Sequence, residues 1–411
     1  MSNCRACGST LELQLIDLGT SPISNKYLTF AELQEPESWF PLKVLVCEIC
    51  WLAQIDCLID PENLFVSDYA YLSSISASWL THAKEFVSFL TRSFSLDHQS
   101  FVLEIASNDG YLLENFVQQN IRCLGVEPTE YAAILAEKRG VPTYRDFYNV
   151  HTATLIASEY GKATILIANN VLAHVPNPCD LLQAIHFGLS EHGVASLEFP
   201  HLVPLVQDVK FDTIYHEHYS YFSLSALINL ASKCGLKVIG ADKLDTHGGS
   251  LRVFLSKDNS NVQLPFETQL LPILREESEL GVCTKIFYSD FQAKAVKIRN
   301  QLLRFVLECQ EAGLKIAAYG AAAKGNTLLN FLGLRQDQVV FVVDKSPSKQ
   351  GKFLPGSRIP IVKEEVLLDQ CPEIILVLPW NLELELTSQL SYVPKYGGKL
   401  VFPLPKLKVV S

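Results

Sequence analysis

The stretch FVLEIASNDGYLLENF, residues 101–116, has the pattern of a β-strand that ends in a polar loop and continues into a helix. Similar units alternate from about residue 75 to residue 245, with further apolar strands in RCLGVE, ATILIANN and GVASLEFP. Strands that alternate with helices in this way form a parallel sheet with helices on both faces. The sequence therefore predicts a doubly wound α/β domain.

The polar loop after this strand predicts a site for a nucleoside-type ligand. Glu127 ends the next strand in LGVEP, where an acid can accept hydrogen bonds from both ribose hydroxyls of an adenosine. The loop has one glycine and no GxGxxG, so it suits a ligand without phosphate, such as S-adenosylmethionine, although a doubly wound fold alone leaves other ligands open. The residues expected at this site are Glu104, Ser107, Asn108, Asp109, Gly110, Glu127, Pro128, Asn169 and Asn170.

The composition is that of an acidic globular protein. The chain has 411 residues, with 34 basic and 44 acidic side chains and a formal net charge of −10. At ~150 residues per domain, this length predicts two to four domains. The acidic balance and the lack of a Lys/Arg block argue against nucleic-acid and membrane-surface partners. No apolar run approaches the ~20 residues that a bilayer requires, and MSNCRACGST has no apolar signal region, so we expect a cytoplasmic protein.

Three segments differ in their residue patterns. Residues 1–74 are rich in cysteine and contain short strand-like pieces, and residues 75–245 hold the strand–helix alternation. Residues 246–411 begin with a helix-like stretch from about 266 to 311 and continue with KIAAYGAAAKGNTLLNFL, VVFVVDKS and EIILVLPW. We therefore expect a small N-terminal domain, a doubly wound domain and a second, Rossmann-like α/β domain.

The N-terminal cysteines predict a zinc site. CRAC and CEIC are two CxxC knuckles, and two such turns complete the tetrahedron of thiolates that zinc prefers. A disulfide framework is disfavoured because nothing indicates secretion, and a thioredoxin-like motif would be single and placed at a helix start. A closed four-thiolate site is structural, since no coordination position stays open. The predicted ligands of Zn²⁺ are Cys4, Cys7, Cys47 and Cys50.

A cluster of titratable and phenolic side chains lies in FDTIYHEHYSYFS, residues 211–223. It is either a polar loop or an active site that moves a proton. If the segment is extended, His216 and His218 share one face and Glu217 leaves it, whereas a turn would remove this expectation. A metal site is disfavoured because HEH lacks the helical HExxH spacing and an obvious third ligand.

Together with other runs, these motifs resemble the S-adenosylmethionine-dependent sugar C-methyltransferases, which methylate nucleotide-linked 4-keto deoxysugars. The shared order extends over essentially the whole chain: two CxxC knuckles, DLGTSPISNKYL, YAYLSSIS, LEIASNDGYLL, GVEPT, ANNVLAHVPN, FDTIYHEHYSYFS, HGGSLRVF, GAAAKGNTLLN and VVDKSPSKQGKFLPGSRIPI. One position departs from the pattern, because Ala106 stands where we expect the family to favour glycine. The resemblance implies a zinc-binding domain, a class I methyltransferase domain and a C-terminal Rossmann-like domain.

The resemblance also implies methyl transfer to carbon 3 of a (d)TDP-linked 4-keto-deoxysugar. Carbon has no lone pair, but a proton beside a ketone is acidic, so a base can form an enolate whose carbon accepts the methyl group. Histidine suits this task with an ordinary pKa of ~6.5. By resemblance the base is His218, and its neighbours are Glu217, Tyr215, His174 and either Tyr69 or Tyr71. The alternative is a methyltransferase acting on another carbon, a nitrogen or an oxygen of a nucleotide sugar or related small molecule.

The C-terminal α/β segment leaves two interpretations open. Small residues and Lys324 at a predicted helix start form a candidate anion site for a nucleotide diphosphate, and Arg252 could pair with phosphate. Equally, the segment could be a wall of the cleft without a ligand of its own. The family resemblance and the absence of heptads predict a monomer.

Overall fold

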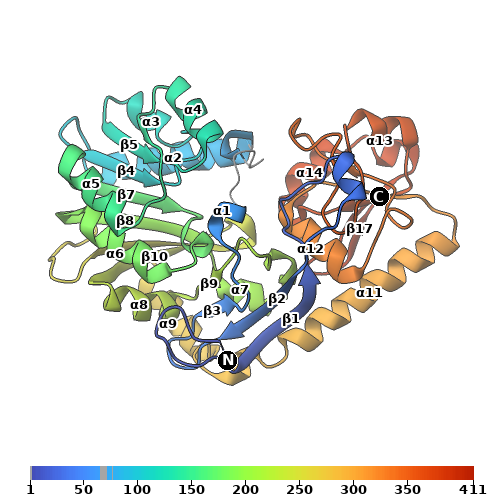
Figure 1. The fold of residues 1–411 in the computed structure, drawn as a ribbon, viewed down its shortest axis with the longest axis horizontal. Coiled ribbons are helices and arrows are strands. Elements are labelled where there is room, and N and C mark those ends of the chain that lie inside the picture. Colours follow the sequence, from blue (N-terminus) through green and yellow to red (C-terminus); the bar gives the residue numbers. More distant parts are fainter. Residues whose placement is uncertain (1, 65–71, 76) are drawn as a thin grey trace.

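The computed structural model describes residues 2–64, 72–75 and 77–411 (Figure 1). Tyr69 and Tyr71 lie outside the described residues. The described chain contains three β-sheets, of four, seven and six strands. Figure 1 shows the seven-stranded and six-stranded sheets on opposite sides, with the N-terminal strands below and between them.

The four-stranded N-terminal sheet is antiparallel, in the order β1-β2-β3-β9. Its first three strands are β1 (Leu13–Ser21), β2 (Phe40–Val46) and β3 (Ala53–Ile55), and a short helix, α1 (Pro61–Leu64), follows. The fourth strand, β9 (Ser220–Tyr221), comes from the histidine-rich segment far along the chain. The N-terminal domain therefore holds the end of that segment by strand pairing.

The seven-stranded sheet has the order β10-β11-β8-β7-β4-β5-β6, in which β11 runs antiparallel to both of its neighbours and the remaining pairs are parallel. This arrangement confirms the predicted class I methyltransferase sheet. Its strands are β4 (Phe101–Ile105), β5 (Arg122–Val126), β6 (Thr143–Tyr144), β7 (Ala163–Asn169), β8 (Leu189–Pro200), β10 (Leu236–Leu244) and β11 (Ser250–Lys257).

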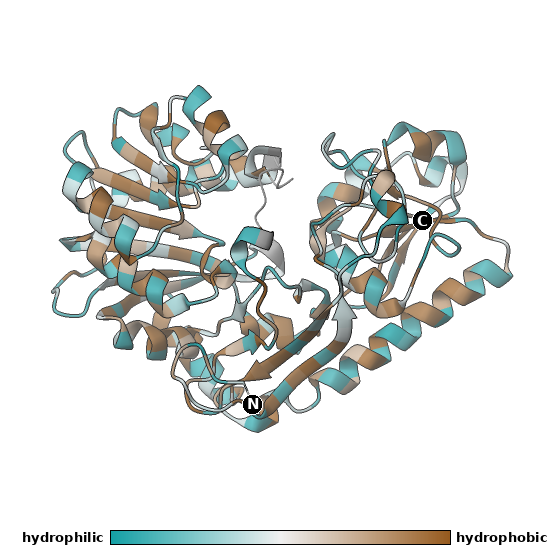
Figure 2. Cartoon of the chain, viewed as in Figure 1, coloured by the Kyte–Doolittle hydropathy of each residue, from teal (hydrophilic) through white to brown (hydrophobic). Residues whose placement is uncertain are grey.

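Both faces of this sheet are covered by helices, as the alternating side chains of β4 show. Leu103 and Ile105 belong to a core that includes side chains of α5 (Val150–Tyr160), α6 (Pro178–Gly188) and α8 (Leu224–Lys233). Val102 points to the other core, which is built from α2 (Ala77–Ser93), α3 (Glu114–Val117) and α4 (Glu130–Lys138). Figure 2 shows the strands as mostly hydrophobic and the outer helix surfaces as mixed with hydrophilic residues.

The six-stranded C-terminal sheet has the order β14-β13-β12-β15-β16-β17 and is parallel except for β17. Its strands are β12 (Ile316–Tyr319), β13 (Val342–Val343), β14 (Ile361–Val362), β15 (Ile374–Val377), β16 (Lys399–Phe402) and β17 (Lys408–Val410), with helices α12 (Ala323–Leu332), α13 (Glu365–Gln370) and α14 (Glu383–Gln389). A second doubly wound unit is thus present, as predicted.

The helix-like stretch predicted from about 266 to 311 is divided in the structure. It forms three helices: α9 (Leu270–Glu279), α10 (Lys285–Tyr288) and α11 (Phe291–Glu311). The first break lies at Gly281, whose φ of 70° ends α9 in the left-handed region that glycine tolerates best.

One hydrophobic core joins the N-terminal sheet, the histidine-rich segment and the C-terminal domain. Val44 of β2, Phe211 and Ile214 of that segment, and Leu329 of α12 are all buried members of it. The segment lies between α7 (Leu202–Gln207) and α8, and a short 3-10 helix, η4 (Phe211–Thr213), forms its start. The histidine-rich segment therefore packs against both the N-terminal sheet and the C-terminal domain.

Candidate active site

The histidine-rich segment forms a turn at residues 215–218. The expectation that His216 and His218 share one face assumed an extended chain. The backbone N–H of His218 donates to the carbonyl of Tyr215 at 2.9 Å, which closes a turn through His216 and Glu217. Because of this turn the three side chains diverge toward different parts of the molecule. The condition for His216 and His218 to share a face, an extended segment, is therefore not met.

His218 and Tyr215 form a hydrogen-bonded pair. Tyr215 Oη lies 2.8 Å from Nε2 of His218, and the ring centroids are 4.0 Å apart. Nδ1 of His218 lies 2.8 Å from the carbonyl oxygen of Thr213, which can only accept. In a neutral ring Nδ1 therefore carries the proton and donates to Thr213, while Nε2 presents its lone pair to the Tyr215 hydroxyl. This leaves a basic nitrogen beside a phenolic donor in a site where His218 is only 8% exposed.

His174 meets His218 from the methyltransferase domain. It ends a short 3-10 helix, η3 (Leu172–His174), just beyond β7, and its ring centroid is 4.7 Å from that of His218 in an edge-on arrangement. The carboxyl end of β7 also carries Asn169. The structure therefore brings the predicted residues Tyr215, His174 and His218 together at the carboxyl edge of the parallel strands, where ligands of such sheets bind.

Glu217 turns toward the N-terminal domain. Its two carboxylate oxygens lie 2.8 and 2.7 Å from Nδ2 of Asn25, in the loop after β1. The carboxylate is 1% exposed, so this donor offsets part of the cost of burying it. Sequence analysis quoted the run SPISNKYL but did not single out Asn25, because no local pattern connects it to residue 217.

His216 has a structural position. Its Nε2 lies 3.1 Å from the carbonyl of Pro41, and its ring packs edge-on against Phe40 on β2. Burial lowers the pKa of this imidazole, which keeps it neutral near pH 7. Donation from Nε2 to Pro41 then fastens the segment to the N-terminal sheet.

The polar loop after β4 is fastened to the next strand through Glu127. One carboxylate oxygen of Glu127 accepts from the backbone N–H of Asn108 at 2.9 Å, and the other accepts from the N–H of Thr129 at 2.9 Å. Ala106 and Asn108 both have a φ of 51°, in the left-handed region. This explains why glycine is favourable at position 106, since a Cβ there carries a strain cost.

One carboxylate oxygen of Asp109, Oδ2, pairs with Arg139 on the chain after α4 at 3.1 Å. Several buried polar atoms of this region have no hydrogen-bond partner among the described residues, including Glu104 Oε2, Ser107 Oγ, Asp109 Oδ1 and Asn169 Oδ1. Burial raises the pKa of Glu104 well above its ordinary value. Unsatisfied buried groups at the ends of adjacent strands fit a polar ligand such as S-adenosylmethionine, which would supply their missing partners.

A charged cluster that sequence analysis missed lies beside this loop. Glu198, near the end of β8, accepts from Arg252 at 2.6 Å and lies 2.9 Å from Nε2 of His82 on α2. Hydrogen bonds from these partners hold the pKa of Glu198 at about 2 despite its burial. Arg252 is therefore engaged within the chain and is not the open phosphate ligand that its motif suggested.

The basic residues of the C-terminal domain are also engaged. Lys324, at the start of α12, donates to Asn381 and packs over the ring of Trp380, and burial lowers its pKa to about 8. Lys349 donates to the carbonyl of Ala321 at 2.9 Å and lies 3.6 Å from Asp344. These bonds stabilise the turn between β12 and α12.

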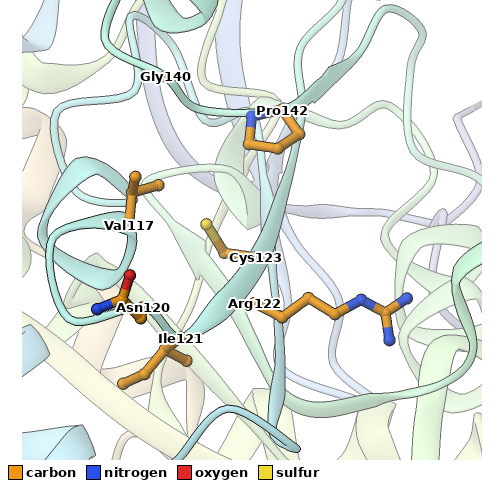
Figure 3. A pocket seen from close by; sticks show the side chains of 7 residues that line it. All are labelled: Val117, Asn120, Ile121, Arg122, Cys123, Gly140 and Pro142. Atoms are coloured by element: carbon orange, nitrogen blue, oxygen red, sulfur yellow. The ribbon is translucent and has the colours of Figure 1, made fainter.

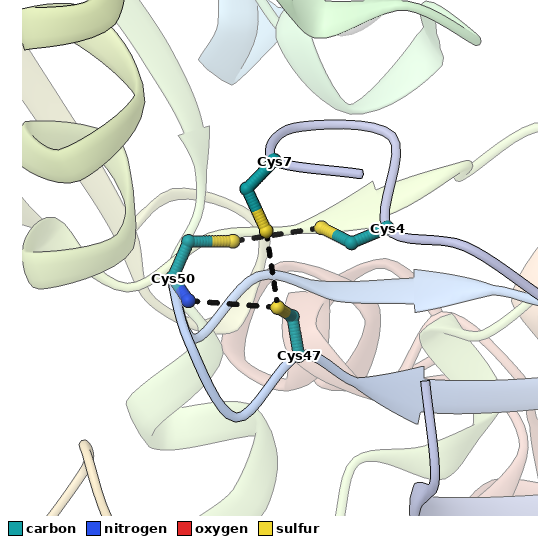
Figure 4. Close-up of side chains that lie close together, drawn as sticks. All are labelled: Cys4, Cys7, Cys47 and Cys50. Atoms are coloured by element: carbon teal, nitrogen blue, oxygen red, sulfur yellow. Dashed lines mark hydrogen bonds between the residues drawn. The ribbon is translucent and has the colours of Figure 1, made fainter. Parts of the chain in front are cut away.

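The four predicted zinc ligands converge (Figure 4). The Sγ atoms of Cys4, Cys7, Cys47 and Cys50 all lie within 4.8 Å of one another. Backbone N–H groups of Ala6 and Ile49 point at Cys4 and Cys47 Sγ at 3.4 Å, which is a favourable arrangement for thiolates. Four convergent thiols in this geometry suit zinc, and the cluster confirms the prediction.

A surface pocket of about 320 Å³ lies at the opposite edge of the methyltransferase sheet (Figure 3). Ile121 and Arg122, at the amino end of β5, help to line it. The predicted site residues follow the carboxyl ends of the strands, so this pocket does not belong to that site.

Comparisons with known proteins agree with this geometry. Residues 4–65 match a family described as a zinc binding domain, residues 79–241 a methyltransferase domain, and residues 245–405 a C-methyltransferase C-terminal domain. The chain is 33% identical over 411 residues to C-methyltransferase NovU of Streptomyces niveus, a match that covers 100% of this chain and 97% of NovU.

This chain belongs to the C-methyltransferase family. As a member it is a methyltransferase with S-adenosylmethionine as its methyl donor and a zinc-binding N-terminal domain. Among the described residues, no helix is both long and apolar enough to cross a bilayer.

Solved structures of other methyltransferases resemble less than half of this C-methyltransferase. One from Anabaena variabilis is 16% identical with a TM-score of 0.35, over 42% of this chain and 84% of its own. The magnesium protoporphyrin IX methyltransferase ChlM of Synechocystis is 13% identical with a TM-score of 0.34, over 43% of this chain and 79% of its own. Likeness at this level adds no detail to the site.

Proposed function

We propose that this enzyme methylates carbon 3 of a (d)TDP-linked 4-keto-deoxysugar, with His218 as the base that forms the enolate. The pairing of His218 with Thr213 and Tyr215 is the observation that carries the proposal. Thr213 keeps the ring proton on Nδ1, so Nε2 is the nitrogen that can remove a proton from carbon. Without substrate the Tyr215 hydroxyl donates to Nε2 at 2.8 Å. In the proposed reaction it would turn this proton to the keto oxygen as negative charge develops there, which frees the Nε2 lone pair to accept the proton from carbon.

The other predicted residues have supporting roles in this proposal. His174 packs edge-on against the base and narrows its freedom to rotate, and the Glu217 carboxylate can accept a hydrogen bond from a sugar hydroxyl. The residues that would hold S-adenosylmethionine are those with unsatisfied polar atoms at the ends of β4 and β7 and in the loop after β4, namely Glu104, Ser107, Asp109 and Asn169. When bound, the sulfonium supplies an electrophilic methyl group.

Solvent exchange separates this reaction from methylation of a heteroatom. In D₂O without methyl donor, the enzyme should incorporate deuterium at carbon 3 of a (d)TDP-linked 4-keto-deoxysugar. His218→Asn should slow both exchange and methylation by about 10²- to 10⁴-fold, the usual contribution of a general base. His216→Gln is the matched control, because glutamine can still donate to the Pro41 carbonyl, and it should keep both rates. Methylation without exchange, together with an active His218→Asn variant, would contradict the carbanion route.

A further inference from the structure

The Asn25 amide connects the N-terminal domain to the acidic side chain of the histidine-rich segment. Nδ2 of Asn25 lies 2.8 and 2.7 Å from the two carboxylate oxygens of Glu217. A carboxylate with 1% exposure needs donors to stay ionised, and reversal of the amide would set an oxygen against it. The carboxylate therefore fixes which side of the Asn25 amide faces it, and Oδ1 faces away.

Tyr27 occupies the other side of that amide. Its hydroxyl lies 3.2 Å from Oδ1 of Asn25 and 2.7 Å from the carbonyl oxygen of Ala321, at the turn between β12 and α12. Both neighbours are acceptors, so the one phenolic proton serves the C-terminal carbonyl and the Asn25 amide together. Tyr27 is 7% exposed, and burial raises the pKa of this phenol, which keeps it a donor.

The Ala321 peptide is itself fixed from both sides. Its N–H donates to Oδ2 of Asp344 at 2.7 Å, and its carbonyl accepts from Lys349 at 2.9 Å as well as from Tyr27. A second contact between the same elements supports the link, since Thr327 Oγ1 donates to the carbonyl of Ile214 at 3.0 Å. Buried hydrogen bonds thus connect the turn between β12 and α12 of the C-terminal domain to the histidine-rich segment, so a shift of one would displace the other.

We propose that Asn25 is a positioning residue that holds Glu217 ionised and oriented toward the substrate, and that Tyr27 couples this to the turn around Ala321. The inference rests on the proposed function, because it assigns Glu217 to substrate binding. Among the described residues, titratable groups near this carboxylate include His218, Tyr215 and Tyr219 of its own segment, and Tyr27. Asp344 and Lys349 of the C-terminal domain lie around Tyr27.

Asn25→Asp tests the role with almost no change of shape, because it sets a like charge against Glu217. We expect kcat at pH 7 to fall at least about tenfold. Protonation of the proposed base His218 sets the main acid limb of the pH–rate profile, and we expect the further step that Glu217 adds to this limb to move about one unit upward, since a neighbouring carboxylate raises the pH at which Glu217 ionises. The KM for S-adenosylmethionine should not change. Asn259→Asp, in an exposed turn, is the matched control and should keep the wild-type profile.

Tyr27→Phe provides a second variant that removes one oxygen atom only. It should move the Glu217 step of the acid limb in the same direction by a smaller amount, and circular dichroism should confirm folding of each variant. A wild-type profile in both variants, while His218→Asn abolishes deuterium exchange, would overturn the positioning role and leave the proposed function standing. Retained exchange in His218→Asn would instead refute the proposed function itself.

Discussion

Gln54 should strengthen zinc binding although it is not a ligand. It lies on β3 with 0% exposure, and its Nε2 is 3.2 Å from Sγ of Cys4. Its Oε1 accepts from the backbone N–H of Arg5, between the two cysteines of the first knuckle, at 3.0 Å. Gln54→Met keeps the length of the side chain and removes both contacts.

The size of the effect follows from the charge on sulfur. Zinc-bound cysteines are thiolates, and a hydrogen bond to a charged group contributes about 1.5–3 kcal/mol. Since about 1.4 kcal/mol corresponds to a factor of ten in a binding constant, loss of the bond to Cys4 should weaken zinc binding about 10- to 100-fold.

Competition with a chromogenic chelator measures the zinc affinity of each variant directly. The readout is the zinc concentration at which protein and chelator bind equal amounts of the metal. Gln14→Met is the matched control, because Gln14 is an exposed residue of β1 in the same sheet, and it should bind zinc within about twofold of wild type. If Gln54→Met held zinc as tightly as Gln14→Met, the hydrogen bond to Cys4 would contribute nothing and the reasoning would be refuted.

Three further perturbations test contacts between the domains and inside the methyltransferase domain. Arg5→Met removes a guanidinium that donates to the carbonyls of Ile55 on β3 and Tyr219 in the histidine-rich segment, so methylation should slow about tenfold while zinc content, measured by atomic spectroscopy, stays at one per chain. Burial raises the pKa of Asp212 to about 6, so the fluorescence of Trp380, which donates to it at 2.6 Å, should titrate near pH 6 and lose that step in Asp212→Asn. The folded protein thus binds the proton of Asp212 more tightly than the unfolded chain does. The free energy of unfolding that protonated Asp212 contributes is therefore lost as pH rises from about 4 through 6. A Cβ on Gly125 would lie 2.3 Å from Ser107 Oγ, so Gly125→Ala should weaken binding of S-adenosylmethionine about tenfold by calorimetry, and adding Ser107→Gly should restore only part of it, because the clash is relieved but the hydroxyl is lost.

Local patterns were sufficient to predict the sheets and the metal site. The strand 101–105 and the two CxxC knuckles are short-range signals, since alternation and ligand spacing are properties of neighbouring residues. Strand order in the methyltransferase sheet then follows from fold class. The assignment of Cys4, Cys7, Cys47 and Cys50 to one site required only that two knuckles meet.

Contacts between distant segments could not be predicted in this way. Nothing local to Asn25 indicates Glu217, and nothing local to Glu198 indicates His82 or Arg252, because each pair meets only after the domains pack. The choice between an extended segment and a turn at residues 215–218 stayed open for a related reason. His216 and Glu217 have partners on the N-terminal domain, so tertiary contacts rather than residue pattern set the local conformation.

The domain boundaries at 74 and 245, the cytoplasmic location and the monomeric state stay predictions. The catalytic roles of the site residues are likewise proposals. Tyr69 and Tyr71 fall in the part of the chain that the structure does not describe. Mass measurement in solution and the exchange experiment address the oligomeric state and the base, respectively.

The arrangement suggests why a zinc domain accompanies this chemistry. Strand β9 extends the N-terminal sheet, Arg5 in the first knuckle donates to the carbonyl of Tyr219, and His216 donates to Pro41. The segment that carries the proposed base is therefore attached to the zinc-binding N-terminal sheet. His174 and the polar loop after β4 belong instead to the methyltransferase domain. In the proposed mechanism, abstraction of a proton from carbon requires the base within hydrogen-bond reach of that carbon, so a rigid mount for His218 would contribute directly to rate.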